Sequence, residues 1–197
     1  MHYFLGLEAW QSPEGIFLNQ GKYAVEILKR FDMLECKAMA TPMDTHMKLL
    51  VDASSELVDV TLYKHNIGSL MYLMNTRTDI CFDVNTLSKY LVDPRHVHLV
   101  AAKHLMRYLK GTIDLGLYYG RDHDYRLYGY TDSDWEGSVA YKKITSSGCY
   151  FLGSSMISWF SKKQPSVSLS TTEEEYNVAC SASCEAIWLQ KTDVRTI

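Results

Sequence analysis

Hydrophobic residues in the first 110 positions of the chain recur mostly at helical spacing. Two short strands, over residues 3–10 and 15–19, are predicted first, because Ser12-Pro13-Glu14-Gly15 between them is typical of a turn. The stretch 36–62 has no clear period and is predicted to be irregular. Beyond residue 20, apolar residues three or four positions apart predict helices with one buried face. These stripes are Tyr23, Ile27 and Phe31; Ile67, Leu70, Met71 and Met74; Ile80, Val84, Leu87 and Leu91; and Ala102, Leu105 and Leu109.

Near residue 115 the hydrophobic period changes from helical to alternating. A last helix is predicted over 172–190. The predicted strands before it are 115–119, 125–132, 147–152 and 156–161. The change of period indicates two domains, 1–112 and 113–197, in a protein of the α+β or α/β class. The chain has 197 residues, 47% of them hydrophobic, which is enough for two modest globular domains.

Two carboxylates stand where a strand and a helix could bring them together. Asp132 lies near the C-terminal end of the strand 125–132, on the same face as Tyr128 and Tyr130. In the last helix, an acidic residue heads a stripe of small and apolar residues that should pack closely on a sheet. The stripe consists of Glu175, Ala179, Ala182, Ala186 and Leu189. Glu175 would then lie at the edge of this contact and point toward the end of a strand.

Converging carboxylates repel each other and need a compensating cation. Oxygen ligands without nearby His or Cys favour Mg²⁺ or Mn²⁺, and two such ions support phosphodiester hydrolysis. The residues alone leave another interpretation open. Asp132 can be an ordinary strand-end residue, and Glu173 to Glu175 can complement the helix dipole after an N-cap at Ser170 or Thr171.

The most basic predicted element is the helix over about 97–110, which Gly111 should end as a C-cap. Lys103, Arg107 and Lys110 fall at i, i+4 and i+7 and form one basic stripe. Such a stripe can follow the phosphates of a nucleic-acid duplex, or it can be an ordinary solvated face. The formal net charge of −3 gives no global signal for nucleic-acid binding, so any such surface must be local.

Cysteine usage and the absence of targeting segments bear on the compartment. The five cysteines have no paired spacing, and nothing completes a zinc set around Cys180 and Cys184, so all five are predicted to be reduced thiols. No run of about 18 apolar residues is present, and the first six residues lack the features of a secretory signal. We therefore expect an intracellular protein, in the reducing cytoplasm or nucleus, with no membrane partner.

Seven short motifs follow one another between residues 125 and 190. They are Gly129–Gly137, Thr145–Gly148, Phe151–Gly153, Ile157–Trp159, Ser161–Pro165, Ser170–Tyr176 and Cys184–Leu189. In order and spacing they resemble the ribonuclease H domain of Ty1/copia-type retrotransposon Pol polyproteins. The resemblance implies Asp132 and Glu175 as catalytic residues and metal ligands. It also implies Mg²⁺ or Mn²⁺ as the cofactor of an active enzyme, with no other cofactor, and Lys162 and Lys163 beside the backbone of an RNA–DNA hybrid.

Motifs in the first 120 residues extend the likeness upstream. They are Tyr3–Glu8, Gln20–Ala24, Thr41–Met43, Gly68–Leu73, Thr76–Ile80, Arg107–Thr112 and Gly116–Tyr119. They are similar to the end of the reverse transcriptase palm and the thumb and connection region, which would cradle a template–primer duplex. The resemblance thus implies a helical, thumb- or connection-like first half. A ribonuclease H-like mixed sheet with one packed helix, shortened at its C-terminus, should follow.

The chain departs from the family pattern in three respects. The polymerase turn of the family lies upstream of the strand at Phe4, so polymerase activity is not expected. The family continues past the last helix into a strand with a third catalytic Asp. Here the chain stops at Ile197, which should leave the strand 125–132 as an unprotected sheet edge. Thr78 stands where Pro is usual, and Tyr141-Lys142-Lys143 where an acidic residue and Arg are common.

These observations lead to one main function and two alternatives. The main expectation is a degenerate Pol fragment without catalysis that retains weak binding to RNA–DNA hybrid or DNA. The first alternative is a residual metal-dependent ribonuclease H, which needs Asp132. The second is a non-catalytic interaction protein reused by the host, which does not need that carboxylate. The sequence does not indicate an oligomeric state.

Overall fold

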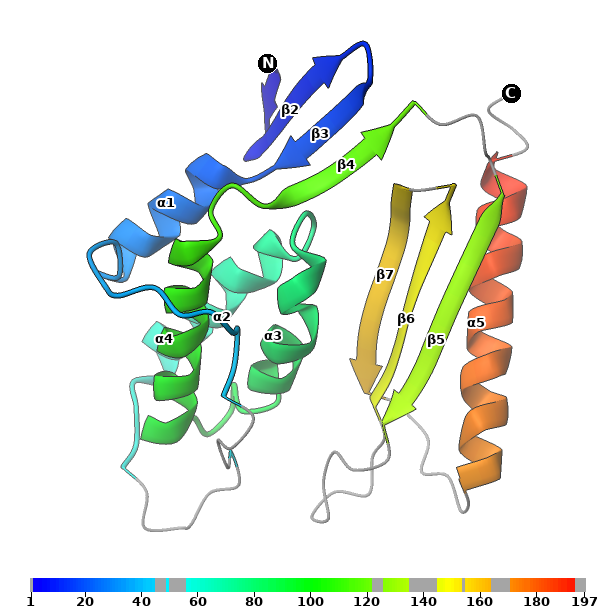
Figure 1. Cartoon of the computed structure of the whole chain (residues 1–197). Coiled ribbons are helices and arrows are strands. Elements are labelled where there is room, and N and C mark those ends of the chain that lie inside the picture. The colour runs from blue at the N-terminus through cyan, green and yellow to red at the C-terminus, as the bar shows by residue number, and fades with distance from the viewer. Residues whose placement is uncertain are drawn as a thin grey trace. The chain divides into compact units, whose positions relative to one another are not determined.

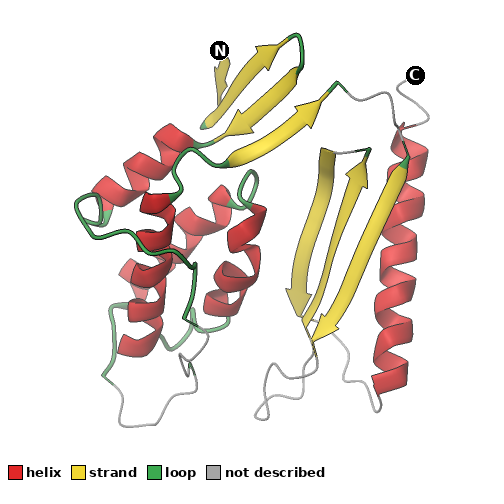
Figure 2. Cartoon of the chain, in the orientation of Figure 1, coloured by secondary structure: helices red, strands yellow, loops and turns green. Residues whose placement is uncertain are grey.

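The computed structural model describes residues 2–44, 49, 56–121, 126–134, 145–153, 155–163 and 171–193. Within them it combines helices with antiparallel strand pairs, which confirms a fold of mixed helix and sheet compatible with the α+β class (Figure 2). The chain divides into two compact units, residues 1–118 and 119–197. This division lies after the predicted boundary at 112, because β4 (Gly116–Gly120) neighbours β3 (Gly15–Asn19) in the sheet of the first unit.

The sheet of the first unit has the strand order β1 (His2–Phe4), β2 (Leu7–Ser12), β3, β4 (Figure 1). The prediction of a single strand over 3–10 is wrong, because the chain reverses at Leu5 and Gly6. Both residues have positive φ, 47° and 77°. A two-residue loop with two positive φ angles matches the twist of an antiparallel pair. The local backbone conformation, which the hydrophobic pattern does not encode, therefore divides the predicted strand in two.

The helices of the first unit share one hydrophobic core. They are α1 (Gly21–Arg30), α2 (Val60–Leu73), the 3-10 helix η1 (Thr78–Ile80), α3 (Cys81–Ser88) and α4 (His96–Gly111). The apolar stripe predicted for α4 is confirmed, since Ala102, Leu105 and Leu109 are fully buried in this core. The predicted α3 stripe likewise places Ile80, Val84 and Leu87 in the core.

The predicted faces of α1 and α2 are correct only in part. In α2, Ile67 and Leu70 are fully buried, but Met71 is 39% exposed, because Tyr63 and Leu73 complete the inward face instead. Phe31 is the C-cap of α1 and only half-buried, so it does not continue the helix. The buried face of α1 consists of Gly21, Ala24, Ile27 and Leu28.

Gly111 does not have the role predicted for it. It is the last residue of α4, the C-cap is Thr112, and Gly111 has no positive φ. Its small size matters for packing, since an added Cβ would lie 3.2 Å from the Ala38 Cβ. The segment before α2 also bonds to α4, through a hydrogen bond from the Met39 N–H to the Arg107 carbonyl of 3.2 Å. Gly111 therefore lets the segment around Ala38 approach the end of α4 closely, and it does not form a turn that ends the helix.

The second unit packs one helix on a three-stranded sheet of order β5 (Leu127–Asp134), β6 (Thr145–Leu152), β7 (Ser155–Lys163). The helix α5 (Thr171–Asp193) lies against β5 and β6 (Figure 1). Among the described strands β5 is an edge, as expected, and all pairs are antiparallel rather than mixed. Antiparallel pairing is the usual outcome for strands that follow one another along the chain.

Asp83 makes the stability of the first unit depend on pH. Burial raises the pKa of its carboxyl to about 6, with the negative charge of Asp79 adding to the effect and His104 opposing it. Because the folded-state pKa exceeds the unfolded value, the folded protein holds a proton that the unfolded chain releases. The associated stability is present below the unfolded pKa and is lost as pH rises toward about 6.

We therefore expect Asp83→Asn to raise the free energy of unfolding at pH 7.5 by about 1–2 kcal/mol. At pH 4 the gain should nearly vanish, since the native carboxyl is then protonated. Urea unfolding of both proteins at the two pH values measures the difference. The exposed Glu35→Gln serves as control and should show no such pH-dependent gain. An equal gain at both pH values would contradict a titrating Asp83.

Candidate nucleic-acid and metal site

The strand β5 carries Asp132, whose backbone pairs with Ser147 of β6 across the antiparallel ladder. The neighbouring Thr131 hydroxyl donates a 3.0 Å hydrogen bond to the Ser147 carbonyl, which fixes the strand end. Tyr130 contacts Phe151 edge-on, with ring centroids 6.1 Å apart. The side chain of Asp132 lies outside the described part of the structure. The structure thus places the backbone at this position and leaves the carboxylate a prediction.

The stripe predicted to pack α5 on the sheet is correct in part, since Ala182, Ala186 and Leu189 are half-buried. Val178 is 5% exposed, whereas Ala179, predicted to be buried, faces solvent. Two hydrogen bonds fix the helix on the sheet: Tyr150 Oη donates to the Ala182 carbonyl at 2.9 Å, and Ser158 Oγ to Glu185 Oε1 at 3.4 Å. Val178 is therefore buried at the turn of α5 where burial of Ala179 was predicted.

Glu175 lies one turn before Val178 and is exposed. β5 runs toward the end of the unit at which α5 begins, so the C-terminal part of β5 and the first turns of α5 lie at the same end (Figure 1). Asp132 and Glu175 therefore both belong to this end of the packed strand and helix. Among the residues that the structure describes, no three His, Cys, Asp or Glu side chains gather as a metal site.

The three basic residues of α4 differ in their surroundings. Lys103 is exposed, whereas Arg107 and Lys110 are half-buried. The Arg107 Nε donates a 2.8 Å hydrogen bond to the Lys37 carbonyl, so this guanidinium also holds the segment before α2. Lys162 and Lys163 end β7, in register with Ser146 and Thr145, and their side chains lie outside the described residues.

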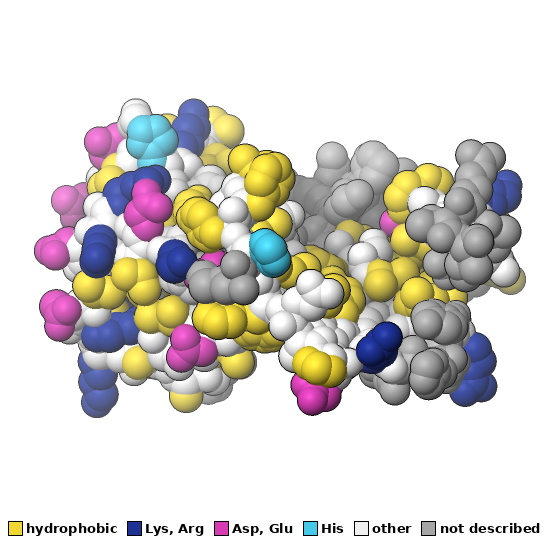
Figure 3. Space-filling view, turned by 90° about the horizontal axis from the view of Figure 1, so that it is seen from above, with side chains coloured by type: hydrophobic (Ala, Val, Ile, Leu, Met, Phe, Trp, Pro, Cys, Tyr) yellow, Lys and Arg dark blue, Asp and Glu magenta, His cyan; other side chains and the backbone are white. Residues whose placement is uncertain are grey.

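On the face shown in Figure 3, basic and acidic side chains are interspersed over the first unit. This distribution agrees with the net charge of −3 and with a local rather than a global cationic surface. None of the five cysteines, all of which lie in the described part of the chain, forms a disulfide, and Cys180 and Cys184 are exposed on α5. No helix of the described residues is long and apolar enough to cross a membrane.

Sequence reasoning missed one buried polar network, which positions the end of α4. Arg77 is 2% exposed, and its Nε and Nη2 donate to the two carboxylate oxygens of Asp79 at 2.9 and 2.7 Å. Its Nη1 and Nη2 also reach the carbonyl and hydroxyl oxygens of Thr112, at 2.8 and 2.7 Å. Tyr108 donates to Asp79 at 2.8 Å. Burial alone would raise the pKa of Asp79, but hydrogen bonds and the charge of Arg77 lower it below its usual value. The sequence analysis pointed to this network only through the motif Thr76–Ile80, which contains Arg77 and Asp79.

Among the relatives of the chain are Pol polyproteins of transposons. It is 41% identical over 189 residues, 96% of its length, to the retrovirus-related Pol polyprotein from transposon RE2 of Arabidopsis thaliana. It is 37% identical over 188 residues to the uncharacterized mitochondrial protein AtMg00810 of the same plant, of which it covers 78%. The chain belongs to the copia-type retrotransposon Pol polyproteins. It spans 13% of the length of the RE2 polyprotein.

A further relative of the chain carries a different kind of name. The chain is 41% identical over 135 residues, 68% of its length, to the secreted RxLR effector protein 161 of Plasmopara viticola, of which the match covers 95%. No protein-family model and no solved structure matches the chain. The sequence relatives therefore show the family, and this structure shows the fold of each unit.

Proposed function

We propose that this copia-type Pol protein binds RNA–DNA hybrid weakly and does not cleave it efficiently. The observation that carries the proposal is the basic stripe of α4. In this stripe Lys103 is exposed and Lys110 is half-buried, on a different face of the helix from the buried apolar residues. The exposed ammonium of Lys103 is suited to phosphate contacts, which are electrostatic and independent of sequence. Binding should be weak, because Arg107 is partly engaged by the Lys37 carbonyl.

The buried Arg77–Asp79–Thr112 network supports the same proposal. It ties the last turn of α4 to η1, so the helix that presents the basic stripe has a fixed C-terminal end. A surface on a rigid element loses less entropy on binding than one on a loop. In this proposal the first unit corresponds to the reverse transcriptase connection region, and the second to a ribonuclease H-like domain.

Residual ribonuclease H activity is the second candidate, favoured by the common end of β5 and α5 that carries Asp132 and Glu175. The donor chemistry of this pair fits Mg²⁺ or Mn²⁺, since both are carboxylates, and the exposed Glu175 is accessible to a hydrated ion. When bound, such ions would activate water and stabilise the leaving oxygen. The departure Tyr141-Lys142-Lys143 from the family pattern, close in sequence to Asp132, supports inefficient rather than full activity.

Binding is tested by fluorescence anisotropy with a labelled RNA–DNA hybrid over a range of salt concentrations. We expect Lys103→Ala to weaken binding and to reduce the slope of log K against log salt by about 1, as loss of one phosphate contact requires. Lys64→Ala, an exposed lysine on α2, is the matched control and should leave both quantities unchanged. Equal effects of the two substitutions would show that α4 has no particular part in binding.

Cleavage of the same hybrid in Mn²⁺ separates the two candidates. The main proposal predicts background-level cleavage by both the wild-type chain and Asp132→Asn, with both shown to be folded by circular dichroism. Cleavage by the wild type that Asp132→Asn abolishes would instead establish the ribonuclease. Cleavage that survives the substitution would point to a contaminating nuclease and support neither candidate.

A further inference from the structure

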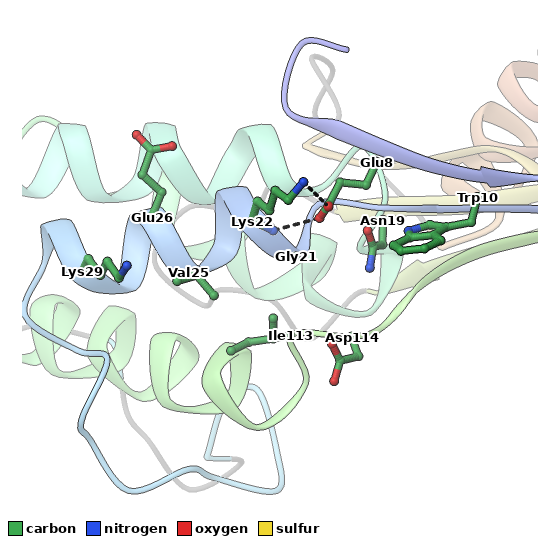
Figure 4. A pocket seen from close by; sticks show the side chains of 10 residues that line it. All are labelled: Glu8, Trp10, Asn19, Gly21, Lys22, Val25, Glu26, Lys29, Ile113 and Asp114. Carbon is green, nitrogen blue, oxygen red and sulfur yellow. Dashed lines mark hydrogen bonds and ion pairs between the residues drawn. The ribbon is translucent and has the colours of Figure 1, made fainter. Parts of the chain in front are cut away.

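A cavity of about 520 Å³ lies in the first unit, where the β2–β3 hairpin meets the start of α1 and the segment that follows α4 (Figure 4). Its size is within the usual range for small-molecule sites. Trp10 forms one wall, and its side chain is 49% exposed. Val25 and Ile113 supply apolar surface, while Lys29 and Asp114 stand at the rim as exposed charges.

The N-terminus of α1 in this cavity already has its own cap. The N-cap residue Gln20 makes no side-chain cap, and Glu8 of β2 takes over this role from a distance in sequence. Its Oε2 accepts from the Lys22 N–H at 3.0 Å, and its Oε1 lies 3.3 Å from Lys22 Nζ (Figure 4). Glu8 and Lys22 therefore satisfy each other, and a ligand would have to be recognised by the remaining groups.

One of the remaining groups is buried and has no partner. Asn19 lines the cavity beside Trp10 and is only 8% exposed, yet its Oδ1 accepts no hydrogen bond from the described residues (Figure 4). A buried amide oxygen without a donor destabilises the folded state, so a ligand that supplies a donor gains from pairing with it. Gly21 keeps the space beside it open, since a Cβ there would lie 3.3 Å from Glu8 Oε2 and 3.6 Å from Asn19 Nδ2.

We infer that this cavity binds a nucleotide whose base carries an exocyclic amine. The amine would donate to the free Oδ1 of Asn19, and the planar base would stack on the exposed ring of Trp10. The phosphate would lie near Lys29, whose ammonium is exposed at the rim. Trp10, the Oδ1 of Asn19 and Lys29 would thus meet the ring, the N–H donor and the anion of one ligand. Of the three lining carboxylates, Glu8 is paired with Lys22 and Glu26 with Arg30, and Asp114 remains available to further N–H donors of the base. The inference goes beyond the proposed function and does not depend on α4 or on Asp132.

Isothermal titration calorimetry of the full chain with AMP and with a short oligo(rA) strand tests the inference. Either source can supply the base: binding of AMP assigns the cavity to free nucleotides, and binding of the strand alone assigns it to a base within single-stranded RNA. Trp10→Ala should weaken binding about tenfold. Trp188→Ala, which removes another exposed tryptophan, on α5 of the second unit, is the control and should change nothing.

The role of Asn19 is tested without altering the protein. N6,N6-dimethyl-AMP keeps the ring and the phosphate but has no amine hydrogens, so it should bind about tenfold more weakly than AMP. In the strand arm, N6,N6-dimethyladenosine replaces adenosine. Absence of saturable binding by both probes would overturn the inference, as would binding that neither Trp10→Ala nor dimethylation weakens. Lys103→Ala should affect the hybrid but not AMP, so failure of this site is distinguishable from failure of the proposed function.

Discussion

Arg77→Ala should lower the free energy of unfolding of the first unit by about 3 kcal/mol. The substitution removes the arginine donors to Asp79 and Thr112 together, so the Asp79 carboxylate loses its ion pair. Asp79 keeps the hydrogen bond from Tyr108, and the Thr112 carbonyl keeps the one from the Leu115 N–H. Removing one partner of a buried ion pair typically costs about 3–5 kcal/mol. The lower end applies because the Asp79 side chain is 33% exposed and water can solvate part of it.

Native-state hydrogen exchange of the α4 amides measures this loss within the first unit. Arg30→Ala is the matched control, since it also removes an arginine from a carboxylate, at 3.1 Å from Glu26. That pair is exposed on both sides and separated by one helical turn, so its loss should cost less than about 0.5 kcal/mol. Similar costs for the two arginines would mean that the Arg77 network contributes no more than a surface pair.

Gly116→Ala should lower the free energy of unfolding by about 2–3 kcal/mol, because its backbone neighbours leave no room for a methyl group. An added Cβ would lie 2.2 Å from the Leu18 carbonyl oxygen and 2.7 Å from the Asn19 Cβ. The closest of these atoms belongs to the backbone of β3, so relief requires the two strands to separate. Urea unfolding followed by circular dichroism measures the change.

Gly68→Ala provides a control of opposite sign. Gly68 lies within α2 and an added Cβ meets nothing within 4 Å, so alanine should stabilise the helix by about 0.5–1 kcal/mol through reduced backbone entropy. Two identical substitutions in one unit should therefore shift stability in opposite directions. A loss at both positions would indicate that the space around Gly68 is tighter than the structure describes.

The sequence alone determined the elements whose partners are local. Helical spacing of Ala102, Leu105 and Leu109 predicted α4 and its buried face, because a helix of that length must bury one apolar stripe. Alternation predicted β5, β6 and β7, since side chains of a strand point alternately to its two faces. The motifs around Asp132 and Glu175 indicated the family of the chain, and its sequence relatives then confirmed this family.

Only the tertiary structure decided the contacts between residues far apart in the chain. Glu8 caps α1 from β2, and Arg77 bonds to Thr112, 35 residues away, although neither residue differs in its local pattern from an ordinary surface charge. Tertiary packing also buried Val178 rather than Ala179, while Tyr150 donates a hydrogen bond to the carbonyl of Ala182 on the predicted stripe. Hydrophobic periodicity specifies which face of an element is buried to within about one position. The partner of that face depends on long-range packing, which no local pattern records.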